Sequence, residues 1–546
     1  MKNIIFIISL LSLISCQEKT STKNISKMES KEFVWEGANI YFLLTDRFNN
    51  GNTSNDINFD RTKETGKLRG FEGGDIKGIT KKIKEGYFTK LGINAIWMTP
   101  IVEQIHGGTD EGTGVSYGFH GYWTKDWTSI DPNFGTKEDL KELVSIAHKN
   151  GIRILLDAVI NHTGPVTEKD PVWPSDWVRT EPACTYDSYE HTVSCTLVEN
   201  LPDIKTESNE AVALPPQLVE KWKAEGRYEQ EVKELDAFFA RTGHPRAPRF
   251  YIMKWLTDYI TEFGIDGYRV DTVKHTEEFV WQEFKQECDV AFADYKKNNA
   301  DKVLDNNDFY LVGEVYNYAI SHGKAFNFGD RKVNYFDKAF NSLINFELKW
   351  NVKQMAEKDV FYKYDSILNK ELKGYGILNY MTSHDDGQPF DKERKMPYKT
   401  ATMLMLTPGT SQVYYGDESA RDLTIEGTVG DATLRSNMNW NEFYEKQNIL
   451  AHWQKIGQFR ANHMAVGAGK HTLISDENGL VFSRVRNDDK VVVGINLPKG
   501  NKVIDVSTIF KNGEKLLDFY SNQTIEVKNG IVSLNSEFDI VLLESK

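Results

Sequence analysis

Residues 267–275 read GYRVDTVKH, a short apolar run that carries an arginine two positions before an aspartate. In an extended strand alternate residues share a face, so Arg269 and Asp271 point the same way. An arginine beside a carboxylate lowers the pKa of that carboxylate and keeps it ionised, which suits a nucleophile better than a proton donor. A buried structural ion pair is the alternative interpretation of a single RxD sequence.

Three other apolar runs end in the same way, with carboxylates or histidines at their carboxyl ends. DAVINH (157–162) follows one run, LVGEVY (311–316) ends a second run with Glu314, and MTSHDD (381–386) follows a third. Polar groups at the ends of several parallel strands form the active site of a (β/α)8 barrel. Four such ends in one chain favour an active site over chance ion pairs and core histidines.

The order of elements along the chain points to the same fold. We expect strands at 40–44, 95–98, 152–160, 267–270, 309–315, 342–346, 377–381 and 411–415. Helical patterns alternate with them at 137–149, where Thr136 is a suitable N-cap, at 251–263 and at 277–297. This alternation predicts an α/β fold, a (β/α)8 TIM barrel over residues 33–464.

Two further parts are expected beside the barrel. About ninety residues separate DAVINH from the helix at 251, far more than a βα loop needs, so residues 163–248 are predicted to form a domain inserted after strand 3. Within it, residues 217–241 have a charged helical pattern. After residue 464 short alternating runs at 480–486, 490–497, 531–534 and 539–543 predict a C-terminal antiparallel β-domain over 465–546.

Length and charge narrow the class of protein. The 546 residues, 40% of them hydrophobic, are enough to bury a large core across two or three domains. The formal net charge of −13 argues against nucleic acid or an anionic membrane surface as a partner.

The four polar strand ends resemble the conserved regions of the α-amylase family, glycoside hydrolase family 13. The segments NIYFLLTDRF (39–48), 71–100, LPDI (201–204) and QVYYGDE (412–418) resemble that family too, and the likeness runs from about residue 33 to the C-terminus. It implies an endo-acting, retaining α-amylase that hydrolyses the α-1,4-glucosidic bonds of starch and maltodextrins. The segment FFARTGHPRAPRFY (238–251), with the nearby cysteine pair, is similar to bacterial periplasmic α-amylases in particular.

Two alternatives stay open. A glucanotransferase, a cyclomaltodextrinase or a neopullulanase has the same fold. No residue of the sequence reveals whether a sugar hydroxyl or water attacks the covalent glycosyl-enzyme intermediate. A non-catalytic glucan-binding lipoprotein is the alternative from another class, against which the intact carboxyl residues Asp271, Glu314 and Asp385 argue.

Catalytic roles follow from the resemblance and from the chemistry of retention, which needs one ionised and one protonated carboxyl group about 5 Å apart. Asp271 is expected to be the nucleophile. Glu314, among apolar neighbours and other carboxylates that raise its pKa, is expected to be the general acid and base. Asp385 is expected to bind sugar hydroxyls as the ring distorts.

Other substrate contacts are implied by the same resemblance. Tyr122, in FHGYW, matches a tyrosine that stacks under the cleaved sugar, and His162 and His384 are expected to donate hydrogen bonds to its hydroxyls. Lys274 and His275 resemble the Lys-His pair of α-1,4-glucan cleavers and are expected on the leaving side.

Calcium is the expected cofactor, because the family has oxygen ligands at matching positions. Asn161, Asp203 and the backbone carbonyl of His275 match a site that joins the barrel to its inserted domain. A possible second site resembles one in cyclodextrin glycosyltransferases and comprises Asn50, Asn52, Asn55, Asp56, Gly73 and Asp75. An Asn/Gly turn cluster is the alternative interpretation of this second set.

The N-terminus predicts export. Residues 1–15 resemble a lipoprotein signal peptide whose sequence ends before Cys16, and lipidation of Cys16 would make a membrane a partner only through the lipid anchor. Residues 16–32 form a polar tether, and Gln17 favours the outer membrane. The alternative is an ordinary signal and a periplasmic or secreted protein. The sequence leaves open whether the protein has protein partners.

An exported compartment also permits a disulfide. Cys184 and Cys195 are close in sequence in a region of loop composition, which favours a bridge between them. Cys288 lies in a helical pattern and is expected to be a buried thiol.

Overall fold

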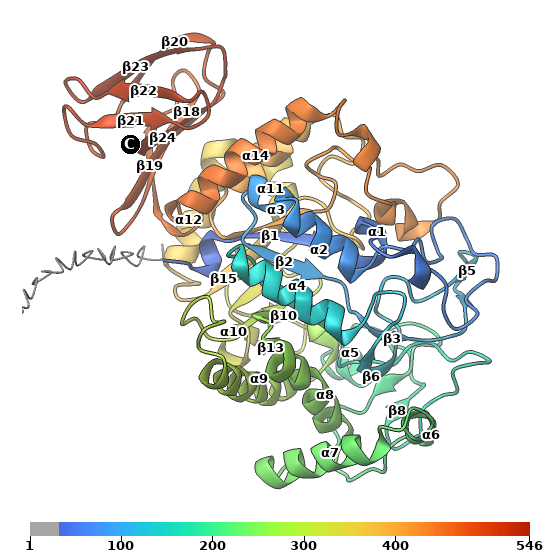
Figure 1. Ribbon diagram of the computed structural model, residues 1–546. Coiled ribbons are helices and arrows are strands. Elements are labelled where there is room, and N and C mark those ends of the chain that lie inside the picture. The colour runs from blue at the N-terminus through green and yellow to red at the C-terminus, as the bar shows by residue number, and fades with distance from the viewer. Residues whose placement is uncertain (1–31) are drawn as a thin grey trace, which may run out of the picture. The chain divides into compact units, whose positions relative to one another are not determined.

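Eight parallel strands close into a barrel in the computed structural model, which describes residues 32–546 (Figure 1). Around the barrel the strands follow the order β1-β16-β15-β14-β11-β10-β7-β2. They are β1 (Asn39–Leu43), β2 (Ala95–Met98), β7 (Arg153–Ala158), β10 (Gly267–Val270), β11 (Tyr310–Gly313), β14 (Ser342–Asn345), β15 (Gly376–Tyr380) and β16 (Thr410–Tyr414). The predicted (β/α)8 fold is therefore confirmed. The predicted signal peptide, Cys16 and all of the tether except Glu32 lie outside the described residues.

The barrel strands are recognisable in the sequence because they are buried on both faces. Every residue of all eight strands is buried. Parallel strands that are covered on both sides read as continuous apolar runs rather than as alternating ones.

Helices follow the barrel strands and cover the outside of the barrel (Figure 1). The principal ones are α2 (Ile76–Lys84), α4 (Lys137–Lys149), α8 (Pro248–Phe263), α9 (Glu278–Asn298), α11 (Leu348–Gln354), α12 (Glu357–Asn369), α13 (Pro397–Leu406) and α14 (Gln447–Asn462), with the single turns α1 (Thr45–Phe48), α3 (Tyr87–Lys90), α10 (Tyr335–Lys338) and α15 (Ala465–Ala468). The predicted N-cap of α4 is present. The Asp139 amide donates to Thr136 Oγ1 over 3.2 Å, and the Thr136 amide donates to the Asp139 carboxylate, which completes a capping box. Helix α8 begins three residues earlier than predicted because Pro248 suits its first turn.

The segment between β7 and α8 carries its own small elements. They are β8 (Val178–Arg179), α5 (Glu190–Val193), β9 (Asp203–Ile204), α6 (Pro216–Ala224) and α7 (Tyr228–Thr242). The charged helical pattern predicted at 217–241 corresponds to two helices, α6 and α7. The chain turns between α6 and α7 at Gly226, where φ is +73°, a conformation that glycine adopts readily and that ends a right-handed helix.

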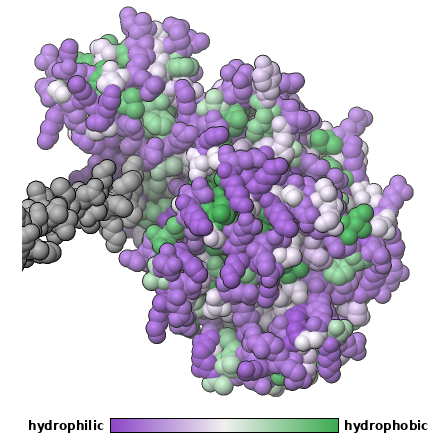
Figure 2. Space-filling model, in the orientation of Figure 1, coloured by the Kyte–Doolittle hydropathy of each residue, from purple (hydrophilic) through white to green (hydrophobic). Residues whose placement is uncertain are grey.

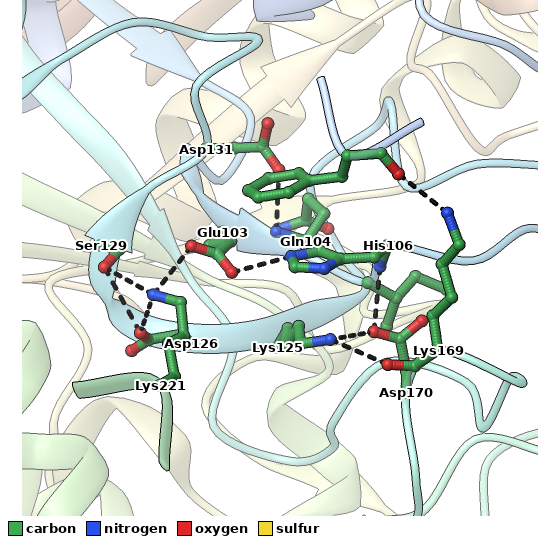
Figure 3. Close-up of polar contacts among 12 residues, drawn as sticks. Glu103, Gln104, His106, Lys125, Asp126, Ser129, Asp131, Lys169, Asp170 and Lys221 are labelled. Atoms are coloured by element: carbon green, nitrogen blue, oxygen red, sulfur yellow. Dashed lines mark hydrogen bonds and ion pairs between the residues drawn. The ribbon is translucent and has the colours of Figure 1, made fainter. Parts of the chain in front are cut away.

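A polar network fastens α6 to a β-ribbon that follows β2 (Figure 3). The ribbon pairs β3 (Val102–Gln104) with β6 (Thr124–Ile130), and the short pair β4 (Thr109–Asp110) and β5 (Val115–Ser116) lies between them in sequence. Lys221 Nζ of α6 lies 2.7 Å from Asp126 Oδ2 and 2.9 Å from Glu103 Oε2. Both carboxylates come from the ribbon, so the inserted segment is tied to the barrel by buried charges.

The chain after α15 forms an antiparallel β-domain, as predicted. A six-stranded sheet has the order β17-β18-β19-β24-β21-β22, and β20 pairs with β23. The strands are β17 (Lys470–Ser475), β18 (Leu480–Arg486), β19 (Asp489–Ile495), β20 (Gly500–Asp505), β21 (Lys515–Asp518), β22 (Gln523–Glu526), β23 (Ile531–Ser536) and β24 (Val541–Ser545). Strands β17, β20, β21 and β22 were not predicted, and all four include exposed positions that interrupt their apolar pattern.

Strand β19 has apolar residues on both faces of this sheet. Val491 and Val493 belong to the large core that includes the barrel, whereas Val492 belongs to a smaller core within the C-terminal domain. Successive side chains of a strand point to opposite faces, which explains this division and the unbroken VVV sequence.

On the face drawn in Figure 2, hydrophilic residues cover most of the surface and hydrophobic residues occur in small, separate groups. No helix within residues 32–546 is long and apolar enough to cross a membrane.

Candidate active site

A cleft of about 690 Å³ lies at the carboxyl ends of the barrel strands. Eight of the residues predicted for substrate or catalysis line it together: Tyr122, His162, Asp271, Lys274, His275, Glu314, His384 and Asp385. The ninth, Arg269, is 1% exposed and lies among the carboxyl groups of the site. The fold thus gathers residues from four polar strand ends and one loop into a single cavity.

Arg269 links the carboxyl groups of the site. Its Nη1 lies 2.6 Å from Asp271 Oδ1, and its Nη2 lies 2.8 Å from Glu314 Oε1. The same Nη1 also lies 3.0 Å from Asp157 Oδ1. Two carboxyl groups that share one guanidinium are close enough to act on the same bond, as a retaining pair about 5 Å apart must.

Asp157 is a residue of the site that the sequence did not single out. Its Oδ2 accepts a hydrogen bond of 2.9 Å from the Tyr122 hydroxyl and one of 3.1 Å from Trp97 Nε1. Burial raises the pKa of Asp157 to about 7, although Arg269 opposes the shift. Asp157 lies opposite Arg269 in the pairing of β7 with β10. Its position as the first polar residue of DAVINH was the only indication in the sequence that it belongs to the site.

The carboxyl groups of the site have different protonation tendencies. Burial raises the pKa of Glu314 well above its usual range, and the charges of Asp385 and Asp271 add to the effect against Arg269. At Asp385 burial also acts to raise the pKa, but His384, the positive charges of Arg269 and Arg435 and a hydrogen bond from Ser383 together outweigh it, so that the pKa is lowered. Glu314 is therefore suited to give a proton, and Asp385 to accept hydrogen bonds as a carboxylate.

The backbone after Asp271 is held in an unusual conformation. Thr272 has a φ of +49°, a region that β-branched residues rarely adopt. Its amide donates to Glu314 Oε2 over 3.1 Å, and the Asp271 amide donates to the Ala158 carbonyl over 2.9 Å. Such backbone strain persists only where the surrounding structure imposes it. Here the two hydrogen bonds impose it, and they fix Asp271 and Glu314 relative to the neighbouring strands.

Two buried histidines border Tyr122. The ring of His384 stacks on Tyr122 with centroids 5.3 Å apart, and burial lowers the pKa of His384 to about 4. Burial lowers the pKa of His162 as well, and its Nε2 lies 3.1 Å from the Tyr122 carbonyl oxygen. Both rings are neutral near pH 7, so that each carries one hydrogen-bond donor and one acceptor.

Lys274 and His275 lie in a 3-10 turn, Val273–His275, that follows Thr272. Lys274 Nζ lies 5.3 Å from the ring centroid of Tyr316 and 5.7 Å from that of Tyr186. Burial lowers the pKa of His275 to about 4, and its Nδ1 lies 3.1 Å from the carbonyl oxygen of Thr192.

The cleft also contains residues that were not predicted to belong to the site. Arg435 comes from a 3-10 turn, Gly430–Arg435, after the last barrel strand, and its Nε donates to the His384 carbonyl over 3.0 Å. Other such residues include Arg69, Glu111, His120, Tyr186, Tyr316 and Asp431. Most of them lie in loops outside the four polar strand ends, where no local pattern marks them.

The first predicted calcium set lies where β9 meets the end of DAVINH. The Ile204 amide donates to the Asn161 carbonyl over 2.8 Å, and Asp203 is 2% exposed. Asp203 Oδ2 is buried and makes no hydrogen bond, although Arg179 Nε lies 2.9 Å from it. A buried carboxylate oxygen of this kind fits a hard cation, and Arg179 supplies part of the compensating charge. Asn161, Asp203 and the His275 carbonyl would hold the ion.

The second predicted set is brought together as a hydrogen-bonded turn. Asn50 Nδ2 donates to Asp56 Oδ1 over 2.9 Å, and a Cβ atom at Gly73 would lie 2.5 Å from Asn50 Nδ2. The carboxylate of Asp75 accepts from backbone amides, including that of Gly78 over 2.6 Å at the start of α2. Asn52 Oδ1 likewise accepts a hydrogen bond from a neighbouring backbone amide, and the buried Asn55 Oδ1 makes none. Most side-chain oxygens of this set therefore already accept hydrogen bonds that stabilise the turn.

Cys184 and Cys195 form a disulfide with a Cα–Cα distance of 4.9 Å. Cys288 is a free, buried thiol. Within residues 32–546 no cluster of three or more His, Cys, Asp or Glu side chains has the arrangement of a metal site.

Two carboxyl groups that share one arginine, one of them with a raised pKa, at the carboxyl end of a (β/α)8 barrel, define the site of a glycoside hydrolase. Comparison with known proteins agrees. Residues 42–462 match the family model of the α-amylase catalytic domain, so the chain belongs to the α-amylase family and is a glycoside hydrolase.

Individual relatives differ in activity. The chain is 36% identical to the periplasmic α-amylase of Escherichia coli (strain K12), over 85% of this chain and 72% of that protein. It is 28% identical to a cyclomaltodextrinase from Bacillus sp, over 85% of this chain and 73% of that protein. The fold matches the crystal structure of an α-amylase from Geobacillus thermoleovorans complexed with acarbose at a TM-score of 0.66 and 24% identity, covering 94% of this chain and 100% of that one.

Proposed function

We propose that the protein is an endo-acting α-amylase that hydrolyses α-1,4-glucosidic bonds of starch and maltodextrins with retention of configuration. The observation that carries this proposal is the guanidinium of Arg269 shared by Asp271 and Glu314. Burial and neighbouring charges raise the pKa of Glu314, whereas Asp271 keeps a cation at 2.6 Å. One group is thereby prepared to give a proton and the other to attack.

In the first step Asp271 attacks the anomeric carbon of the bound glucan. A bond forms between its carboxylate oxygen and that carbon while the glycosidic carbon–oxygen bond breaks. Glu314 transfers its proton to the departing oxygen, so the leaving chain departs as a neutral alcohol. Asp385 binds hydroxyls of the reacting sugar, and Tyr122 provides an aromatic face beneath it.

In the second step Glu314, now a carboxylate, removes a proton from water. The water oxygen attacks the anomeric carbon from the face that the leaving chain vacated, and the bond to Asp271 breaks. Two inversions restore the original configuration, and both carboxyl groups return to their starting states.

A glucanotransferase or cyclomaltodextrinase is the second candidate, favoured by the likeness to a cyclomaltodextrinase. A glucanotransferase differs from an α-amylase in the second step, because a sugar hydroxyl instead of water attacks the covalent intermediate, whereas a cyclomaltodextrinase differs in its preferred substrate. Chromatography of products from starch, pullulan and cyclodextrin distinguishes them. Linear products from the interior of starch support the proposal, whereas cyclic or lengthened products, or a preference for cyclodextrin over starch, would replace it.

The replacement Asp271→Asn tests whether the protein is a catalyst or only a glucan binder. It keeps the size of the side chain and removes the attacking charge, so turnover should fall by several orders of magnitude while maltooligosaccharide binding largely survives. Turnover within about tenfold of the wild type would remove Asp271 from the mechanism. If the wild type bound starch without releasing reducing sugar, the alternative of a non-catalytic glucan-binding lipoprotein would replace the proposal.

Calcium at the first predicted set, Asn161, Asp203 and the His275 carbonyl, is part of the proposal. Its role would be structural, joining β9 to the barrel beside the cleft. The support is the chemistry of the donors and the buried Asp203 Oδ2 that makes no hydrogen bond.

Export and anchoring through Cys16 complete the proposal. The likeness to a periplasmic α-amylase supports export, and the sequence before Cys16 supports lipidation. Mass spectrometry of the mature N-terminus tests both. A lipidated chain that begins at Cys16 is expected, whereas an unmodified N-terminus would indicate a freely secreted or periplasmic enzyme.

A further inference from the structure

A second cavity lies where helices of the barrel meet the C-terminal β-domain. Its volume is about 670 Å³, close to that of the active-site cleft. Helices α13 and α14 contribute Tyr398 and His452 to it, and turns of the β-domain contribute Tyr520 and Phe538. Among the described residues, none lines both this cavity and the active-site cleft. The cavity is therefore a separate concave site of the size that small ligands occupy.

Four rings form a continuous row across this cavity. The ring centroids of Tyr398 and His452 lie 5.1 Å apart. Those of His452 and Tyr520 lie 5.8 Å apart, and those of Tyr520 and Phe538 lie 5.0 Å apart. The two inner rings are buried, whereas Tyr398 is 46% exposed and Phe538 is 43% exposed. The row thus leaves an accessible aromatic face at each end, one on the barrel and one on the β-domain.

The buried ring of His452 holds the row in place. Its Nδ1 lies 2.8 Å from the Tyr520 hydroxyl oxygen. Its Nε2 lies 3.0 Å from Thr402 Oγ1 and 3.2 Å from the Tyr398 carbonyl oxygen. Burial lowers the pKa of His452 to about 4, so that the ring is neutral near pH 7. Because these contacts join the barrel to the β-domain, the exposed rings are fixed before a ligand arrives, which lowers the ordering cost of binding.

Hydrogen-bonding side chains surround the aromatic row. Asn448, Asn496, Lys499 and Asp539 line the cavity and are exposed. They offer amide groups, an ammonium group and a carboxylate, so the lining does not select a ligand of one charge. A sugar unit presents C–H groups on the faces of its ring and hydroxyls around its edge. Aromatic faces bordered by such polar groups are therefore the chemistry that recognises a neutral carbohydrate.

We propose that this cavity is a second α-glucan-binding site, in which Tyr398 and Phe538 stack against sugar rings of the polysaccharide that the active site cleaves. This inference rests on the proposed function, because the ligand that it names is the substrate of that reaction.

The position of the cavity on the barrel suits this role. Tyr398 lies in the first turn of α13, which is the next helix after the strand end that carries Asp385. Helices of a (β/α)8 barrel begin on the side where the carboxyl ends of the strands form the active site. A long polymer can contact both sites, and a chain held at one raises the effective concentration of sugar at the other.

The kinetic test compares a long substrate with a short one in the variant Tyr398→Ala/Phe538→Ala. We expect kcat/KM for soluble starch to fall about tenfold, because the polymer is no longer held at two points. The value for maltoheptaose should stay within about twofold of the wild type, since a short chain gains nothing from a second point of attachment. Tyr362→Ala, at a tyrosine of α12 that is 67% exposed and does not line the cavity, is the matched control and should change neither value.

Two kinetic results would overturn the inference. One is an equal loss on starch and on maltoheptaose, which is the result of a general structural defect. The other is a variant that acts on starch as well as the wild type does.

A binding measurement separates this inference from the proposed function. Maltoheptaose is titrated calorimetrically into Asp271→Asn and into Asp271→Asn/Tyr398→Ala/Phe538→Ala, neither of which needs turnover. We expect two molecules to bind per chain of the first protein and one per chain of the second. A stoichiometry that the two added replacements leave unchanged would overturn the second site. If the wild type released no sugar from starch, the proposed function would fail, and this titration would still decide whether the second site exists.

Discussion

Arg269 contacts both reacting carboxyl groups while remaining buried beneath the cleft. Its positive charge lies 2.6 Å from Asp271 Oδ1 and acts against protonation of Glu314. Glu314 still has a raised pKa because burial is the larger effect, and because Asp385 and Asp271 repel a further negative charge. At the scale of single residues, function therefore depends on unequal environments for chemically similar groups.

The first prediction concerns the proton donor. Glu314→Gln should reduce the turnover of maltooligosaccharides by several orders of magnitude, because their leaving oxygen needs a proton. Turnover of an α-maltosyl fluoride, whose leaving group needs none, should fall much less. Steady-state kinetics on both substrates provide the measurement, and equal losses would require another residue as the acid.

The second prediction concerns pH. The charge of Asp385 helps to raise the pKa of Glu314, so Asp385→Asn should lower that pKa. A carboxyl group with a lower pKa loses its proton at lower pH, and the alkaline limb of kcat/KM should therefore move to lower pH. The profile is measured at high enzyme concentration, because Asp385→Asn will also be slow.

The control for this prediction is Asp476→Asn, at a side chain that is 44% exposed in the C-terminal domain. Asp476→Asn should leave the alkaline limb of kcat/KM at the same pH as in the wild type. An alkaline limb that stays fixed or rises in Asp385→Asn would contradict the assignment of Glu314 as the titrating acid.

At the scale of elements, the contact between α6 and the β3–β6 ribbon depends on Asp126 (Figure 3). Its side chain is fully buried and receives Lys221 Nζ at 2.7 Å and Arg227 Nη2 at 2.9 Å. Burial acts to raise the pKa of Asp126, but the two cations outweigh it and lower the pKa. The ion pairs therefore contribute stability above the unfolded pKa of about 4, and this contribution is lost as pH falls through the lower folded value.

The third prediction removes this buried charge. Asp126→Asn leaves two cations with incomplete compensation in a buried place, and should reduce the free energy of unfolding by about 3 kcal/mol. Thermal or denaturant unfolding measures the change. Glu168→Gln is the matched control, since the side chains of Glu168 and Lys63 in its ion pair are 69% and 61% exposed and the pair should contribute far less. Similar effects of the two replacements would show that burial of the pair is unimportant.

At the scale of the whole molecule, the inserted segment supplies one wall of the cleft, and calcium is proposed where that segment joins the barrel. The fourth prediction is that exhaustive chelation lowers the melting temperature and that calcium restores it. An ion that binds only the folded state adds about 2.7 kcal/mol at a concentration of 100 times its dissociation constant.

Asn161→Ala should abolish the response to calcium, and so should Asp203→Ala, which also leaves Arg179 without its buried partner. Asn501→Ala, at an exposed position of β20, is the control and should retain the response. A melting curve that chelation does not change, together with no metal by elemental analysis, would exclude the calcium site.

The sequence by itself determined the barrel, its order of elements and three of the carboxyl residues of the cleft. A parallel strand covered on both faces must be apolar along its length, and the polar residue that ends it stands out locally, as Asp271, Glu314 and Asp385 do. The N-cap of α4 was also predictable from neighbouring residues alone. The split between α6 and α7 was not foreseen, because Gly226 turns the chain by a backbone angle that a helical pattern of side chains does not reveal.

Only the tertiary structure decided which distant residues meet. Asp157 becomes part of the site because β7 and β10 pair in a register that places it beside Arg269. Tyr186 faces the cleft because a disulfide loop of the inserted segment docks on the turn that carries Lys274. Local sequence sets the periodicity of each element, whereas contacts between loops depend on how the closed barrel brings their anchoring strands together.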